Sequence, residues 1–292
     1  MTSPTFENFS PYHLSWMIYR ELIPYPTTLG MISGVEPEEL SRELGNQLQK
    51  WGVIDSTSQL TPEARKLFRG LYEYDFAYWG ALLLHNEKEP FQLEMDQELI
   101  DIGLGRAIPD TPRVYWQVSY SNGIITIAMR AGDNITINQM STTNENLDNA
   151  LATAILSVIN PVNIWPPAQF TTIKVPFDAV EKVPAYDANG RIYDKATSVR
   201  MIKTELARNG VPRDIISRFT QLIESEKLAE TEILCTSSKT NQASSNFFTI
   251  EFVHRVGMVL SHISTDINGD SIIVQEGATI RAIGNELKKL RK

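Results

Sequence analysis

Apolar residues in the first quarter of the chain recur every three or four positions, which is the spacing of an amphipathic helix. This pattern predicts helices over residues 12–23 and 37–51, and a third helix that begins at Thr61-Pro62. The apolar segment 74–85 that follows is rich in aromatic residues. It could form a strand or a helix, and its aromatic content and flanking residues favour a buried strand.

Between residues 114 and 140 apolar and polar residues alternate, as in a strand buried on one side. Asn122-Gly123 separates two such runs and predicts a hairpin with a two-residue turn. One face of this hairpin is apolar and is expected to be buried: Trp116, Val118, Tyr120, Ile125, Ile127 and Met129. The other face is small or polar and is expected to meet water or a partner: Tyr115, Gln117, Ser119, Thr126, Ala128 and Arg130.

The second half of the chain repeats this order of elements, with two helical stripes, four strand patterns and a final helix over residues 280–290. Residues 160–167 contain three prolines and predict a linker. We therefore expect a single α+β domain over residues 1–292, built of two pseudo-repeat halves (about 1–160 and 168–292). Its architecture would be a central antiparallel β-sheet with helices packed on it and quasi-twofold internal symmetry.

Composition narrows the classes of function. The 292 residues include 27 Lys+Arg against 35 Asp+Glu, a formal net charge of −8, which argues against a nucleic-acid partner. A single cysteine excludes a disulfide framework. The first ten residues lack the pattern of a secretory signal, and no apolar run approaches the roughly 18 residues of a membrane span. We expect a cytoplasmic protein.

Candidate catalytic motifs are sparse. Gly103-Leu104-Gly105 is a fragment of a dinucleotide fingerprint without its third glycine, and residues 266–270 begin like a calcium loop but lack its later ligands. Of the four histidines, His254 and His262 lack an acidic residue at metal-motif spacing, and all four are expected to have packing or surface roles. We therefore predict no cofactor, no metal and no catalytic residue.

Short motifs follow one another in an order that resembles a known family. Near the C-terminus these are a turn at Arg255-Val256-Gly257, a second turn at Asn268-Gly269, and a helix start at Gly277-Ala278-Thr279. Leu60-Thr61-Pro62 and Arg130-Ala131-Gly132-Asp133 precede them. The order resembles the EspG family, the chaperones of actinobacterial type VII (ESX) secretion. The chain departs from that pattern in a displaced turn glycine and in Glu276, which stands where proline is common.

The resemblance implies a central sheet between two helical bundles and a binding function without chemistry or cofactor. EspG proteins bind the apolar helical tip of the PPE subunit in PE–PPE heterodimers, keep the pair soluble and direct it to its secretion machine. The partner meets the sheet and the C-terminal helical bundle. Together with the alternation above, this makes the polar hairpin face and its turn the candidate partner surface: Tyr115, Gln117, Ser119, Asn122, Gly123, Thr126, Ala128 and Arg130. Arginine at Ser119 or Ala128 is then expected to block binding without unfolding the protein.

Two other functions stay open from the sequence. The first is a hydrolase-like enzyme with a non-local active site around the acidic cluster Glu94, Asp96, Glu98 and Asp101. The second is a structural module that forms a homodimer through the same sheet.

Overall fold

One antiparallel sheet runs through the whole molecule. The computed structural model describes residues 6–30, 32, 38–85, 112–184, 190, 193–238 and 243–291. Within these residues ten strands pair in the order β1-β5-β4-β3-β2-β7-β8-β9-β10-β6. The strands of the first half are β1 (Phe6–Phe9), β2 (Phe76–Leu84), β3 (Arg113–Ser121), β4 (Ile124–Ala131) and β5 (Asn134–Ser141). Those of the second half are β6 (Ile173–Pro176), β7 (Lys227–Ser237), β8 (Phe248–Val253), β9 (Gly257–Thr265) and β10 (Ser271–Gly277).

The strand order reads the same outward from both sides of its centre, where β2 pairs with β7. Strands β2, β3, β4, β5 and β1 thus correspond to β7, β8, β9, β10 and β6. This is the α+β architecture with quasi-twofold symmetry that the sequence predicted. The predicted position of the linker, at residues 160–167, stays a prediction, and the short edge strands β1 and β6 were not predicted.

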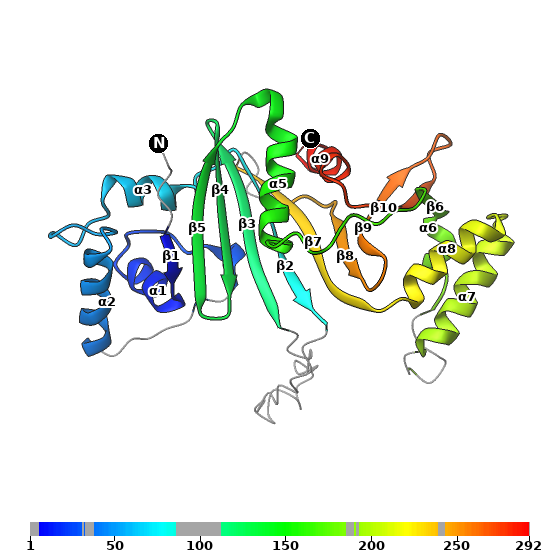
Figure 1. Ribbon diagram of the computed structural model, residues 1–292, viewed down its shortest axis with the longest axis horizontal. Coiled ribbons are helices and arrows are strands. Elements are labelled where there is room, and N and C mark those ends of the chain that lie inside the picture. The colour runs from blue at the N-terminus through cyan, green and yellow to red at the C-terminus, as the bar shows by residue number, and fades with distance from the viewer. Residues whose placement is uncertain are drawn as a thin grey trace.

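Helices cover the sheet in three groups (Figure 1). At one end lie α1 (Pro11–Tyr19), the short 3-10 helix η1 (Thr27–Leu29), α2 (Glu38–Lys50) and α3 (Pro62–Arg69). At the other end lie α6 (Phe177–Glu181), α7 (Lys195–Arg208) and α8 (Arg213–Glu224). Between them α5 (Leu147–Ile159), which follows the 3-10 helix η2 (Asn144–Asn146), packs beside α9 (Ile280–Leu290).

Three apolar cores match these groups. The largest lies between the sheet and the α5–α9 pair and includes Tyr78, Trp116 and Ile250. A second joins α1, α2 and α3 to Ala128, Ile135 and other residues of β4 and β5. The third joins α6, α7 and α8 to Val253 and Val259 of β8 and β9, among others. Because side chains alternate along a strand, the second and third cores lie on the face opposite to α5 and α9.

The predicted hairpin is confirmed, and its register is as expected: Ser121 pairs with Ile124, and Trp116 with Met129. The segment predicted as a buried strand is β2. The first helix ends at Tyr19, four residues earlier than predicted. Glu21 takes a positive φ of 58°, and the amide of Leu22 donates to the carbonyl of Met17, which closes the helix in a Schellman turn. Pro37 lies outside the described residues.

The neutral form of His13 fits its place in the second core. Its Nδ1 accepts the amide of Ser10 at 3.0 Å, and its Nε2 contacts Oε1 of Gln47 at 2.9 Å. Burial lowers the pKa of His13 below 6.5, although the bond to Gln47 acts in the opposite direction. Protonation of Nδ1 would remove the bond from Ser10.

We therefore predict that stability falls as pH drops through 6.5, where the unfolded chain takes up a proton on His13 that the folded chain resists. Above this pH the contribution is fully present. Urea unfolding at pH 7.5 and 5 should show a smaller loss of unfolding free energy for His13→Gln than for the wild type. Equal losses in the two proteins would contradict this role.

Gly80 lies on β2 at the junction of the two halves, close to the backbone of β7. A Cβ atom there would lie 2.1 Å from the carbonyl oxygen of Glu232 on β7 and 3.1 Å from the ring of Trp116. Gly80→Ala should therefore lower the free energy of unfolding by about 2–3 kcal/mol, measured by urea denaturation. Ala81→Ser, at the next position on β2, is the matched control and should change it by less than about 1 kcal/mol. Equal effects would show that the close approach does not matter.

Candidate partner-binding surface

The predicted partner face of the hairpin is covered by the N-terminal part of the same chain. Gln117, Ser119, Thr126 and Ala128 are buried. The side chain of Gln117 donates to the carbonyl of Leu71 at 3.2 Å, and Ala128 lies in the core formed with α1, α2 and α3. The expectation that this face meets water or a partner is therefore wrong for these four residues.

Small and polar residues stand on this face because the chain after α3 lies directly against it. The hydroxyl of Ser119 donates to the carbonyl of Gly70, and a Cβ atom on Gly70 would lie 2.0 Å from Oγ1 of Thr126. Such close backbone contact leaves no room for larger side chains. The alternation thus identified the correct face, but it could not show which segment covers that face.

The remaining residues of the predicted surface lie at its margins. Tyr115 and Arg130 are half-buried. The ring of Tyr115 packs on Gly30, and Nη1 of Arg130 donates to the carbonyl of Leu29 at 3.2 Å, so both contact the segment around η1. Asn122 is exposed at the hairpin turn, where it and Gly123 have φ values of 49° and 79°. Positive φ at both positions is typical of a type I′ turn, which explains their identity without a partner.

A different part of this face carries apolar residues that lie outside the three cores formed by the described residues. It lies on the central strands β2, β7 and β8, between the group α1–α3 and the group α6–α8. Its side chains alternate with Tyr78 and other residues of the largest core, so they point away from α5 and α9. We call it the central strip and define it as Trp79, Ala81, Leu83, Leu228, Glu230, Glu232, Leu234, Thr249 and Glu251, of which Glu232 is exposed.

The apolar members of the central strip are half-buried within the part of the chain that the structure describes. Trp79 pairs with Leu234 across the β2–β7 junction, and Leu83 pairs with Glu230. Among the described residues, none of the three cores counts Trp79, Leu83 or Leu234 as a member or as a neighbour packed against it. Apolar side chains that lie together outside a core mark a surface suited to a partner.

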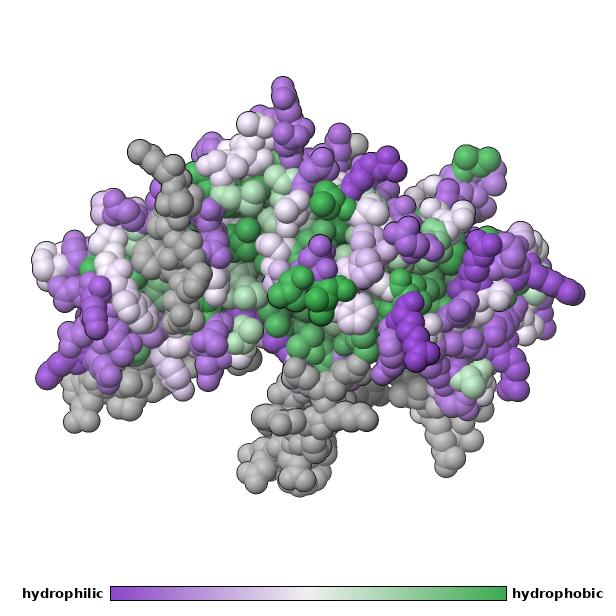
Figure 2. All heavy atoms as spheres, in the orientation of Figure 1, coloured by the Kyte–Doolittle hydropathy of each residue, from purple (hydrophilic) through white to green (hydrophobic). Residues whose placement is uncertain are grey.

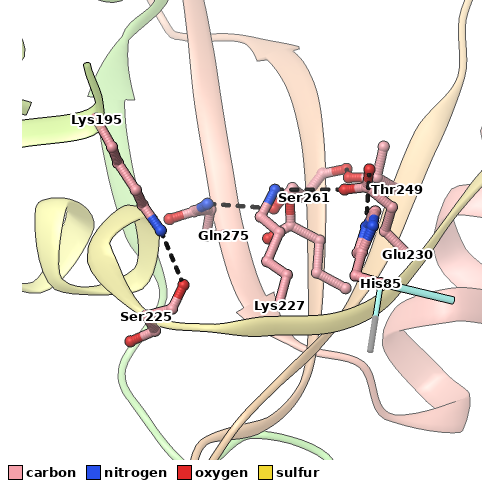
Figure 3. A network of polar contacts seen from close by, with 9 residues as sticks. His85, Lys195, Ser225, Lys227, Glu230, Thr249, Ser261 and Gln275 are labelled. Atoms are coloured by element: carbon pink, nitrogen blue, oxygen red, sulfur yellow. Dashed lines mark hydrogen bonds and ion pairs between the residues drawn. The ribbon is translucent and has the colours of Figure 1, made fainter. Parts of the chain in front are cut away.

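Fixed charges accompany these apolar side chains (Figure 3). The ammonium of Lys227 contacts Oε1 of Glu251 at 2.5 Å and Oε2 of Glu230 at 3.4 Å. Nε2 of His85 lies 3.3 Å from Oε1 of Glu230. Burial acts to lower the pKa of Lys227, but the two carboxylates outweigh it and hold that pKa above its usual value. Lys227 therefore stays charged and keeps both carboxylates in place.

Further polar contacts lead from the central strip toward α7 and α8. Nε2 of Gln275 donates to Oγ of Ser261 at 3.3 Å, and Nζ of Lys195 donates to the carbonyl of Ser225 at 3.2 Å (Figure 3). The surface therefore combines an apolar centre with an ordered polar margin beside the C-terminal helices. Such a pattern is typical of protein interfaces.

The opposite face also carries exposed apolar side chains. Figure 2 shows that face, with hydrophobic side chains near its middle and mainly hydrophilic ones toward both ends. Val162 and Ile164, just after α5, are 71% and 67% exposed. These two exposed apolar residues are suitable control positions for substitutions in the central strip.

Two motifs considered from the sequence, the acidic cluster at 94–101 and Gly103-Leu104-Gly105, lie outside the described residues. Residues 266–270 form a turn, in which the carboxylate of Asp266 accepts the amides of Asn268 and Asp270. These hydrogen bonds within the turn explain the Asp and Asn residues of the calcium-loop-like motif. Within the described residues, no helix has the length and apolar character needed to cross a bilayer.

The arrangement as a whole defines an EspG-like α+β fold. No protein-family model and no curated protein sequence matches this chain. Among solved structures, it is similar to the type VII secretion system chaperone EspG5 of Mycobacterium tuberculosis, determined in complex with a PE25–PPE41 dimer. The TM-score is 0.67 with 11% sequence identity, over 98% of this chain and 95% of that chain. At this identity the similarity establishes the fold.

Because the hairpin face is buried, an arginine on it is expected to destabilise the fold and not only to block a partner. Ala128 is fully buried, so Ala128→Arg should unfold the protein or lower its free energy of unfolding by more than about 3 kcal/mol, measured by circular dichroism during urea denaturation. Asn122→Arg, at the exposed turn of the same hairpin, should change it by less than about 1 kcal/mol. A stably folded Ala128→Arg protein would restore this face as an accessible surface.

Proposed function

We propose that this protein is a cytoplasmic chaperone of a type VII (ESX) secretion system. In this function it binds the apolar helical tip of the PPE subunit of a PE–PPE heterodimer and keeps the pair soluble until export. The observation that carries the proposal is the EspG-like fold along almost the whole chain, on which an apolar strip lies uncovered by any core of the described residues.

The central strip is the surface that we assign to the partner. A helical tip with apolar side chains would pack on Trp79, Leu83 and Leu234, and its polar flanks would meet the charges around Lys227 and Glu230. An interface of ordinary size covers about 800 Å² on each partner, enough to prevent self-association of an exposed apolar tip. The groups α1–α3 and α6–α8 on either side of the strip would restrict how the partner enters.

The chemistry of the strip supports binding rather than catalysis. Glu230 and Glu251 are both paired with Lys227, so they act as fixed partners for hydrogen bonds. Specificity would come from the position of these charges, since a partner that leaves them unpaired loses affinity. No cofactor takes part in this proposal.

A tagged pull-down from native cytosol, with mass spectrometry of the co-eluting proteins, tests the function. We expect a stoichiometric PE–PPE pair, and size-exclusion chromatography should give a complex of one chaperone chain with one pair. A purified protein without any partner, or a stable homodimer that no PE–PPE pair displaces, would contradict the proposal.

Substitutions in the captured complex then test the surface. Leu234→Arg places a charge against the apolar partner and should weaken capture by about tenfold or more, while the melting temperature stays within a few degrees of the wild type. Ile164→Arg is the matched control, since it makes the same change at an exposed apolar residue on the opposite face. Loss of capture by Ile164→Arg with normal capture by Leu234→Arg would move the partner to that face. Glu230→Lys gives a second variant if Leu234→Arg does not fold.

A further inference from the structure

Three potential metal ligands meet where the C-terminal helix lies on the sheet, on the face opposite to the central strip. His262 comes from β9, Glu276 from β10 and Glu286 from α9. One donor atom from each lies within 4.8 Å of the others. His262 and Glu286 are more than nine-tenths buried, and Glu276 is half-buried.

Hydrogen bonds do not explain why the imidazole of His262 is buried here. Nε2 of His262 is 3.7 Å from Oε1 of Glu286, which is too long for a hydrogen bond. Its Nδ1 is buried and has no hydrogen-bond partner. Nε2 thus faces Glu286 without a hydrogen bond to it and is the nitrogen open to a metal ion, whereas Nδ1 would carry the proton of the neutral ring.

The distance between His262 and Glu286 fits a shared metal ion better than a shared proton. Two ligands bound to Zn²⁺ at about 2.0–2.1 Å in a tetrahedron lie roughly 3.4 Å apart, close to the separation of the imidazole and the Glu286 carboxylate. A neutral imidazole nitrogen is a common ligand of such ions.

The internal symmetry shows that the fold does not require ionisable residues here. Counted outward from the turn, Phe248 and His262 correspond to Trp116 and Met129 in the first half. Glu276 pairs with Leu260 as Asn138 pairs with Ile127. The equivalent place in the first half thus holds Met129 and Asn138.

A cation can reach the cluster from solvent. His262, Glu276 and Glu286 line a surface depression of about 930 Å³ together with Lys174, Lys288 and Lys289. The ammonium of Lys289 lies 2.6 Å from Oε1 of Glu286, while the side chain is 56% exposed. Lys289 therefore occupies one carboxylate oxygen, and its flexible, exposed stem lets it move away when a metal enters.

We propose that His262, Glu276 and Glu286 bind one divalent transition-metal ion, with Zn²⁺ as the best fit and water as the remaining ligand. The ion would fasten α9 to β9 and β10. Because the cluster and the central strip lie on opposite faces of the sheet, this proposal does not depend on the proposed function.

Isothermal titration calorimetry of the full chain with ZnCl₂, after dialysis against a chelator, tests the site. We expect one saturable Zn²⁺ per chain and a rise in melting temperature with added metal. His262→Gln should weaken binding by at least about tenfold and abolish the rise. His254→Gln is the matched control, since His254 is an exposed histidine paired with Glu226, and it should bind as the wild type does.

Lys289→Gln separates a metal site from an ordinary ion-pair cluster. Removal of the competing ammonium should tighten Zn²⁺ binding, whereas in a structural ion-pair cluster it would only destabilise the protein. Glu276→Gln replaces His262→Gln if the latter does not fold. Absence of saturable binding in the wild type, or unchanged binding when a ligand is replaced, would overturn the proposal.

Discussion

The pairing of β2 with β7 is the interaction on which the rest of the structure depends. It joins two similar five-stranded halves into one sheet, and Gly80 allows the backbones to meet there. Long-range hydrogen bonds reinforce the junction: the hydroxyl of Tyr78 donates to the carbonyl of Leu287 at 2.7 Å, and Nε1 of Trp116 donates to Oγ1 of Thr231 at 3.2 Å. Because these bonds connect residues of opposite halves, neither half completes the core without the other.

The pairing of β2 with β7 also determines which side of the central strands lies outside the cores of the described residues. The α5–α9 pair covers the centre of the sheet on one face, while on the other face the helices pack toward the two ends. The central strands therefore carry apolar side chains on both faces, and the cores formed by the described residues cover only one of these faces. A partner that packs on the central strip would complete the second side of these strands, which gives the proposed chaperone function a physical basis.

Much of the fold was predictable because its strongest signals are local. Asn122-Gly123 fixed the hairpin and its register, and helical stripes located α3 and α9. What covers the polar face of the hairpin was not predictable in the same way. A small polar residue such as Ser119 has the same place in the pattern whether it contacts water or the carbonyl of Gly70. Alternation shows on which face of the sheet a side chain lies, but not what packs on that face.

A usable signal was present in β2, which is apolar at nearly every position, as a strand buried on both sides would be. Likewise, His262 and Glu286 are far apart in sequence and meet only through the packing of α9.

Site-specific photo-crosslinking tests the central claim, that the strip and not the hairpin turn meets the partner. A benzophenone side chain would be introduced at position 234 in one variant and at position 122 in another, and each would be irradiated in the complex with its captured partner. The account predicts a crosslink to the partner from position 234 and none from position 122. A crosslink from position 122 alone, or from position 234 only to a second copy of this chain, would contradict it.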